Sequence, residues 1–317
     1  MSLPGLAIAL SLAPMSRKVT VQSKATGPQT SQEQLEDWRD RLVALPLLQG
    51  QPSDPHCAPE HHAQALLLLE SIFSMLDMPA TTAASTEQTN TAESRQTILG
   101  TPAFVSSVIA CCGHESLASS ALWVLVRLGR RQLEKSTSHP DNLALMGARC
   151  VDILASVRPE WLRGVGGHLV AHPLCYLIML LASDNEANQM AMVQQCRAHE
   201  VVAACLVEHG AAHSSVAEMA LRACRNLAAC DDNASPLLQA GLCERIVEVL
   251  SRYRALLSFA HSAHREGSSG VSGGGDVCGG TNRAGNASST SAVLDCALWA
   301  AVNLICDEGS CELFAKR

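Results

Sequence analysis

Histidine and cysteine side chains cluster at two places in the sequence and are the first candidates for chemistry. The denser group is His56, Cys57, His61 and His62. Imidazole nitrogen and thiolate sulfur are common zinc ligands, but the spacing here matches no common zinc module. None of the 14 cysteines forms a Cys-x-x-Cys pair. We therefore expect no metal site and no cofactor, and we interpret this group as the polar start of a helix.

The second group, Cys111, Cys112 and His114, contains a nucleophile and a base by residue type. Cysteine catalysis needs a thiolate activated by a base that a third group orients. No such third group lies nearby, and the apolar neighbours indicate a helix end. The glycine-containing run from Arg163 to His168 lacks the Gly-Lys-Ser/Thr signature of a phosphate loop. We expect the chain to have no enzymatic activity.

Composition indicates what kind of framework would hold such residues. The chain has 317 residues, 47% of them hydrophobic and only 3% aromatic, with a formal net charge of −7. This much apolar surface excludes a disordered chain, and its core must be built from Leu, Ala, Val and Cys. The acidic balance argues against nucleic-acid binding. Cysteines set among Ala and Leu indicate reduced core thiols, and hence a cytoplasmic or nuclear protein rather than a disulfide framework.

The chain divides into three parts by pattern. Residues 1–30 are expected to be a disordered tail. Residues 31–97 form a helical N-terminal extension with a linker, because Ser31–Leu45 and Glu60–Leu76 repeat apolar residues at helical spacing. Residues 98–317 are predicted to form successive helices. Val165–Ala182 has no formal charge but contains Pro173, so we expect a buried helix pair there and no membrane span.

Three segments in the last part resemble one another. Ala121–Leu128, Ala220–Leu227 and Ala297–Leu304 each follow the pattern Ala-Leu-x5-Leu. After the second come a Leu-Leu-Gln-Ala-Gly run ending at Gly241 and an apolar helical stretch. A weaker copy puts Asn188 45 residues before Asn233. Repeated helical units of this length cannot bury their apolar faces alone, so the pattern predicts a stack.

The order of these features resembles an armadillo repeat over residues 98–317. The resemblance implies a right-handed α-solenoid whose repeats have a short first helix, a longer second and a third that lines the concave face. It predicts first, second and third helices at 233–240, 242–258 and 291–305, and a preceding third helix at 214–228. The Gly/Ser-rich segment 262–291 is expected to be a disordered loop insertion. The last repeat is expected to be truncated at Arg317.

The same resemblance selects candidate binding residues on the third helices. In armadillo proteins that bind extended peptides, a Trp and an Asn four residues apart project into the groove. Trp299 and Asn303 match this pair fully, whereas Arg222 with Asn226 and Trp123 with Arg127 each match half of it. The Asn amide would bond a ligand backbone and the Trp would wall a side-chain pocket. The alternative is a core Trp and an Asn that bonds the neighbouring repeat's backbone.

Fold and site together predict a function without chemistry. We expect a protein-protein interaction scaffold whose concave face binds a protein or an extended peptide segment. The alternative is a regulatory solenoid fragment of a larger signalling enzyme, whose catalytic domain would lie outside this chain. Neither the partner, nor the pathway, nor the oligomeric state follows from the sequence.

Overall fold

The computed structural model describes residues 31–45, 59–77, 97–129, 140–267 and 281–305. Regular structure in these ranges is entirely helical, with no strand, which confirms the expected all-α class. The expected tail 1–30 and most of the linker lie outside the described residues. The α-helices are α1 (Ser31–Val43), α2 (Pro59–Asp77), α4 (Pro102–Cys112), α5 (Glu115–Gly129), α6 (Pro140–Gly147), α7 (Cys150–Ser156), α8 (His168–Ala182), α9 (Glu186–Gln194), α10 (Ala198–Glu208), α11 (Ser214–Leu227), α12 (Ala234–Gln239), α13 (Leu242–Gly267) and α14 (Thr281–Ile305), and the 3₁₀ turns are η2 (Pro159–Leu162) and η3 (Asp231–Asn233).

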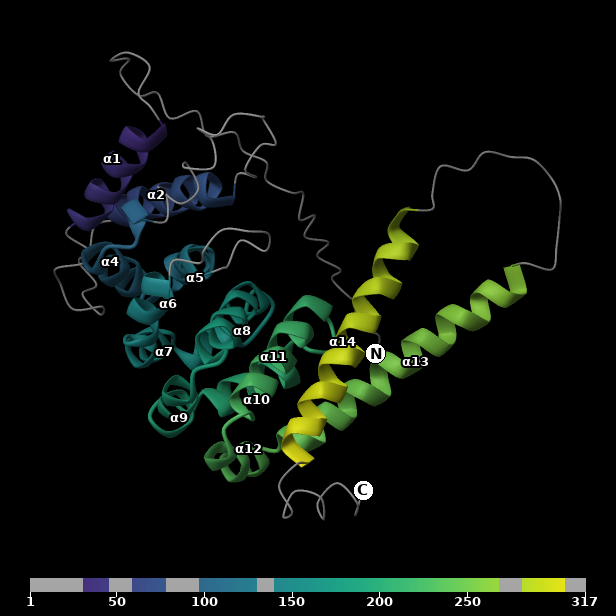
Figure 1. Ribbon diagram of the computed structural model, residues 1–317. Helices are drawn as coiled ribbons and strands as arrows, with labels where there is room; N and C mark the ends of the chain where they lie inside the picture. Colours follow the sequence, from purple (N-terminus) through teal and green to yellow (C-terminus); the bar gives the residue numbers. More distant parts are fainter. Residues whose placement is uncertain (1–30, 46–58, 78–96, 130–139, 268–280, 306–317) are drawn as a thin grey trace, which may run out of the picture.

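Most of the helices lie side by side in two layers (Figure 1). In the first layer α2, α5, α8, α11 and α14 follow in chain order, and each packs on the next. The second layer contains α1, α4, α7, α10 and α13, and it packs on the first through the pairs α1 with α2, α4 with α5, α10 with α11 and α13 with α14. The short helices α6, α9 and α12 each connect a helix of the first layer to the next helix of the second layer. The helices therefore advance from the α1–α2 end to the α13–α14 end.

Small buried side chains let the helices of the first layer approach closely. Helix α11 lies between α8 and α14 and contacts both. Its Ala217, Ala220 and Ala223 are fully buried, as are Leu221 and Leu227. Alanine keeps the interhelical distance short, while leucine fills the space between helices. The recurrence of Ala and Leu in the sequence thus corresponds to an interface on both flanks of one helix.

Helix α8 departs from the expected helix pair because it continues through Pro173. Proline has no N–H, so the carbonyl four residues earlier, that of Leu169, loses its usual helical donor. The Ser119 hydroxyl of α5 donates a hydrogen bond to the Leu169 carbonyl oxygen instead, at 2.8 Å. A neighbouring helix therefore supplies the bond that proline removes, and one helix forms where the sequence predicted two.

The segment 262–291 also differs from expectation. Helix α13 runs to Gly267, and α14 begins at Thr281, so both ends of the predicted loop are helical and its middle lies outside the described residues. Adding residues to an existing helix costs far less than nucleating a new one. Both helices therefore continue into the Gly/Ser-rich segment, past the boundaries that its composition indicates. Gly241 makes the turn into α13 with a φ of +74°, a backbone conformation that a residue with a Cβ rarely adopts.

We expect Leu221→Ala to lower the free energy of unfolding by about 2–5 kcal/mol, because it opens a cavity between α11 and its neighbours. The matched control is Leu298→Ala on α14, where the leucine side chain is 55% exposed. The control is expected to change stability by about 0.5 kcal/mol or less. Urea denaturation followed by circular dichroism measures both. Equal losses in the two variants would contradict the layered packing.

Candidate functional site

A row of polar and aromatic side chains crosses the first helix layer. We call it the strip, and each of its members is half-buried or exposed. Its members come from α2, α5, α8, α11 and α14. They are Phe73, Trp123, Arg127, His172, Tyr176, Glu218, Arg222 and Cys296. On each of the three central helices two members stand four residues apart, which places both on one helical face.

Aromatic contacts join the first half of the strip. The Trp123 ring lies 6.1 Å from the Phe73 ring, measured between centroids. Its edge-to-face partners on α8 are His172, at 5.1 Å, and Tyr176, at 6.2 Å. The Arg127 guanidinium lies over the Phe73 ring, 5.2 Å from its centroid. Three successive helices are therefore linked by ring contacts at the surface of the layer.

Charged groups continue the strip onto α11 and α14. Arg222 forms an ion pair with Glu218 at 2.8 Å, and its guanidinium also interacts with the Cys296 thiol. Burial lowers the pKa of His172 below its ordinary value, and the nearby Glu218 carboxylate opposes part of this shift. The imidazole is therefore largely neutral at neutral pH. Glu218 thus faces both the α8 histidine and the α11 arginine, which makes the row continuous.

The tryptophan and asparagine residues of α14 lie at the end of this row. Trp299 is 57% exposed rather than part of the core, and the Arg225 guanidinium stands over its ring at 5.4 Å. The Asn303 side-chain amide donates to the Arg225 carbonyl oxygen at 3.0 Å. In the same way Asn226 donates to the Met179 carbonyl oxygen at 2.9 Å. Each asparagine thus ties its helix to the preceding helix of the layer.

Both asparagines also line a polar hollow of about 340 Å³. It lies where α8, α11 and α14 end and α9 begins. Its other polar lining residues are Asp184, Asn185, Glu186, Gln189 and Arg225. Carboxylates and amides in one hollow provide partners for a cationic or amide-bearing side chain.

The six residues expected from the sequence therefore all lie on the first layer. Trp123, Arg127 and Arg222 are members of the strip. Asn226 and Asn303 line the hollow, and Trp299 stacks with Arg225 between the two. Sequence reasoning missed Phe73, His172, Tyr176, Glu218 and Cys296. The four-residue spacing of His172 with Tyr176, and of Glu218 with Arg222, was a usable signal for part of this set.

The histidine and cysteine groups have different surroundings. His62 and His114 meet across α2 and the α4–α5 turn, with Nε2 and Nδ1 3.2 Å apart. Burial raises the pKa of Cys111 to about 12 and that of Cys112 well above its ordinary value. These thiols are protonated at neutral pH, which disfavours nucleophilic chemistry. His56 and Cys57 lie outside the described residues. Within the described ranges, no group of three or more His, Cys, Asp or Glu side chains is arranged to hold a metal ion.

No protein-family model matches the chain, and no curated protein matches it. Among the helices that the structure describes, none has both the length and the apolar character needed to cross a membrane.

We expect Asn226→Ala to lower the free energy of unfolding by about 1 kcal/mol, because the Met179 carbonyl loses its side-chain donor. Asn303→Ala should act similarly through the Arg225 carbonyl. Gln194→Ala, exposed at the end of α9, is the control and should be close to neutral. Urea denaturation measures all three. Stabilities equal to that of the control would show that these amides do not connect the helices.

The thiols give a second test of the packing. Burial raises the pKa of Cys224 from 9.0 to about 12, so its thiolate fraction at neutral pH falls about a thousandfold. We expect Cys224 to resist iodoacetamide in the native protein and to react once urea unfolds it. Half-buried Cys296 should react faster in the native state. Mass spectrometry of the alkylated peptides distinguishes the sites, and rapid native labelling of Cys224 would contradict its burial.

Proposed function

We propose that this protein is an armadillo-like right-handed α-solenoid that acts as a non-enzymatic protein-protein interaction scaffold. The observation that supports this most directly is the strip. Its side chains form one row along the surface of the first layer, and they come from the five neighbouring helices of that layer. In the proposal the strip lies on the concave face and binds an extended segment of a partner protein.

The order of the helices supports the solenoid. Helices α9, α10 and α11 form a unit of a short, a longer and a still longer helix, with 9, 11 and 14 residues. Helices α12, α13 and α14 likewise place one short helix of 6 residues before two long ones of 26 and 25 residues. The third helix of each unit packs on the third helix of the previous one. Repeated units that contact mainly their neighbours are the defining property of helical repeat proteins.

The chemistry of the strip suits an extended polypeptide. Trp123, Tyr176 and Phe73 present aromatic surfaces that can cover aliphatic side chains, and aromatic residues supply much of the energy at protein interfaces. Arg222 and Glu218 offer a donor group and an acceptor group beside these rings. The binding free energy would come from several modest contacts along one row, and no covalent step is needed.

The hollow extends this surface at one edge. The side-chain amides of Asn226 and Asn303 each donate one hydrogen bond to a carbonyl oxygen of the preceding helix, and both side chains also line the hollow. A bound segment would therefore meet amide groups that the fold already holds in place. Groups fixed before binding lose little conformational freedom when the ligand arrives.

The experiment selects peptides from a displayed random library on the full chain and measures their affinity by fluorescence anisotropy. We expect Trp123→Ala and Arg222→Glu each to weaken the selected peptides by about tenfold or more, as residues central to an interface do. Trp161→Ala and Arg163→Glu are matched controls away from the strip, and they should leave affinity unchanged. Arg222→Glu keeps an exposed side chain, so it tests binding even if Trp123→Ala reduces stability.

Circular dichroism spectra of all four variants establish that each is folded. Peptides that bind the strip variants and the controls equally well would overturn the assignment of the strip as the binding surface.

A further inference from the structure

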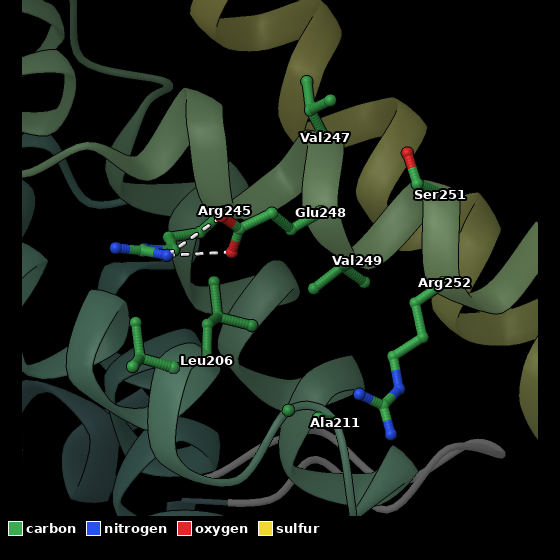
Figure 2. Close-up of a pocket in the computed structure, with 10 residues that line it drawn as sticks. Leu206, Ala211, Arg245, Val247, Glu248, Val249, Ser251 and Arg252 are labelled. Atoms are coloured by element: carbon green, nitrogen blue, oxygen red, sulfur yellow. Dashed lines mark hydrogen bonds and ion pairs between the residues drawn. The ribbon is translucent and has the colours of Figure 1, made fainter.

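A second hollow, of about 610 Å³, lies between α10 and α13 (Figure 2). These helices belong to the second layer, which does not contribute to the strip. We call this hollow the outer groove. Its ten lining residues are Leu206, Val207, Gly210, Ala211, Arg245, Val247, Glu248, Val249, Ser251 and Arg252. A volume of this size accommodates a few side chains of a ligand.

Aliphatic side chains form most of the outer groove. Leu206 and Val207 come from the end of α10, and Val247 and Val249 come from α13. Val207 is 49% exposed beside the buried Leu206 and Val249, so apolar surface of the outer groove remains in contact with water. Covering such surface is favourable in proportion to the area removed from water.

The turn that contains Gly210 and Ala211, at one end of the outer groove, is fixed by a hydrogen bond from α13. The buried Tyr253 hydroxyl of α13 donates a hydrogen bond to the Gly210 carbonyl oxygen at 3.0 Å. A Cβ atom at Gly210 would come within 2.6 Å of the Leu206 carbonyl oxygen, so only glycine fits there. The position of Ala211 in the wall is therefore fixed by the fold before any ligand binds.

Of the charged side chains that line the outer groove, two pair with each other and the third, Arg252, does not. Arg245 donates two hydrogen bonds to the Glu248 carboxylate, at 3.1 and 2.8 Å, and these two charges compensate each other. Arg252 makes no ion pair or side-chain hydrogen bond with any residue in the described part of the chain. Figure 2 shows its side chain reaching toward Ala211, on the far side of Leu206 and Val249 from the Arg245–Glu248 pair. A guanidinium beside aliphatic surface complements a carboxylate attached to an aliphatic group.

We propose that the outer groove docks a segment of a partner protein in which an acidic residue follows or precedes an aliphatic one. The aliphatic side chain packs on Val207 beside Leu206, and the carboxylate pairs with Arg252. The whole chain carries a net charge of −7, so an acidic segment needs a local cation to bind here. This site is independent of the strip, because the two surfaces belong to different layers and share no residue.

The test selects peptides from a displayed random library on the full chain carrying Arg222→Glu, which weakens binding at the proposed strip. We expect the selected peptides to be enriched in Asp or Glu within a few residues of Leu, Ile or Val. Adding Arg252→Glu should replace the acidic preference by Lys or Arg. Adding Arg254→Glu instead is the matched control: Arg254 is exposed on the same helix but does not line the outer groove. It should leave the acidic preference unchanged.

A second pair of variants tests the aliphatic wall. Val207→Asp should weaken the selected peptides by about tenfold or more, because it places a charge where the aliphatic side chain packs. Leu256→Asp is its control, since Leu256 is 52% exposed on α13 and lies outside the outer groove. Fluorescence anisotropy measures the affinities.

Three outcomes would overturn the proposal: no acidic enrichment in the selected peptides, an acidic preference that survives Arg252→Glu, or equal losses from Val207→Asp and Leu256→Asp. These outcomes can be interpreted even if the strip fails its own test, because each variant of the outer groove is compared with its control on the same Arg222→Glu background.

Discussion

The side-by-side packing of α2, α5, α8, α11 and α14 is the constraint on which the other features depend. Each inner member of this layer is apolar on two flanks, so it is stable only between two neighbours. Helix α11 illustrates this, since small residues on it are buried against α8 and α14. Short interhelical distances then allow side chains of one helix to reach the backbone and rings of the next. The strip, the hollow and the asparagine bonds all follow from that reach.

Local defects in these helices are repaired by neighbours rather than within the helix. Pro173 removes a donor from α8, and the Ser119 hydroxyl of α5 replaces it. The amide groups of Asn226 and Asn303 bond carbonyl groups of the preceding helix. Hydrogen bonds between layer members therefore fix the offset of one helix along the next. Since a buried carbonyl without a donor costs free energy, these bonds favour one register over others.

The two layers of the molecule carry different chemistry. The first presents a mixed row of aromatic rings, arginines and a carboxylate, in which most charged groups already have a partner nearby. The second presents the outer groove, with aliphatic walls and a guanidinium that has no partner among the described residues. A surface with paired charges relies on shape and aromatic area for binding, whereas an unpaired charge selects the sign of its ligand. The two surfaces thus suit different partner segments.

The sequence by itself determined the all-helical class, most boundaries from 214 to 250, and the helical face that carries Trp123, Arg127, Arg222, Asn226, Trp299 and Asn303, because these depend on local spacing. Tertiary structure decided which faces meet. Phe73, Tyr176 and Cys296 joined the strip only because neighbouring helices brought them there. Likewise, the continuation of α8 through Pro173 required a hydroxyl from 50 residues away. Contacts between helices depend on the offset of one helix along another, and local spacing carries no information about that offset.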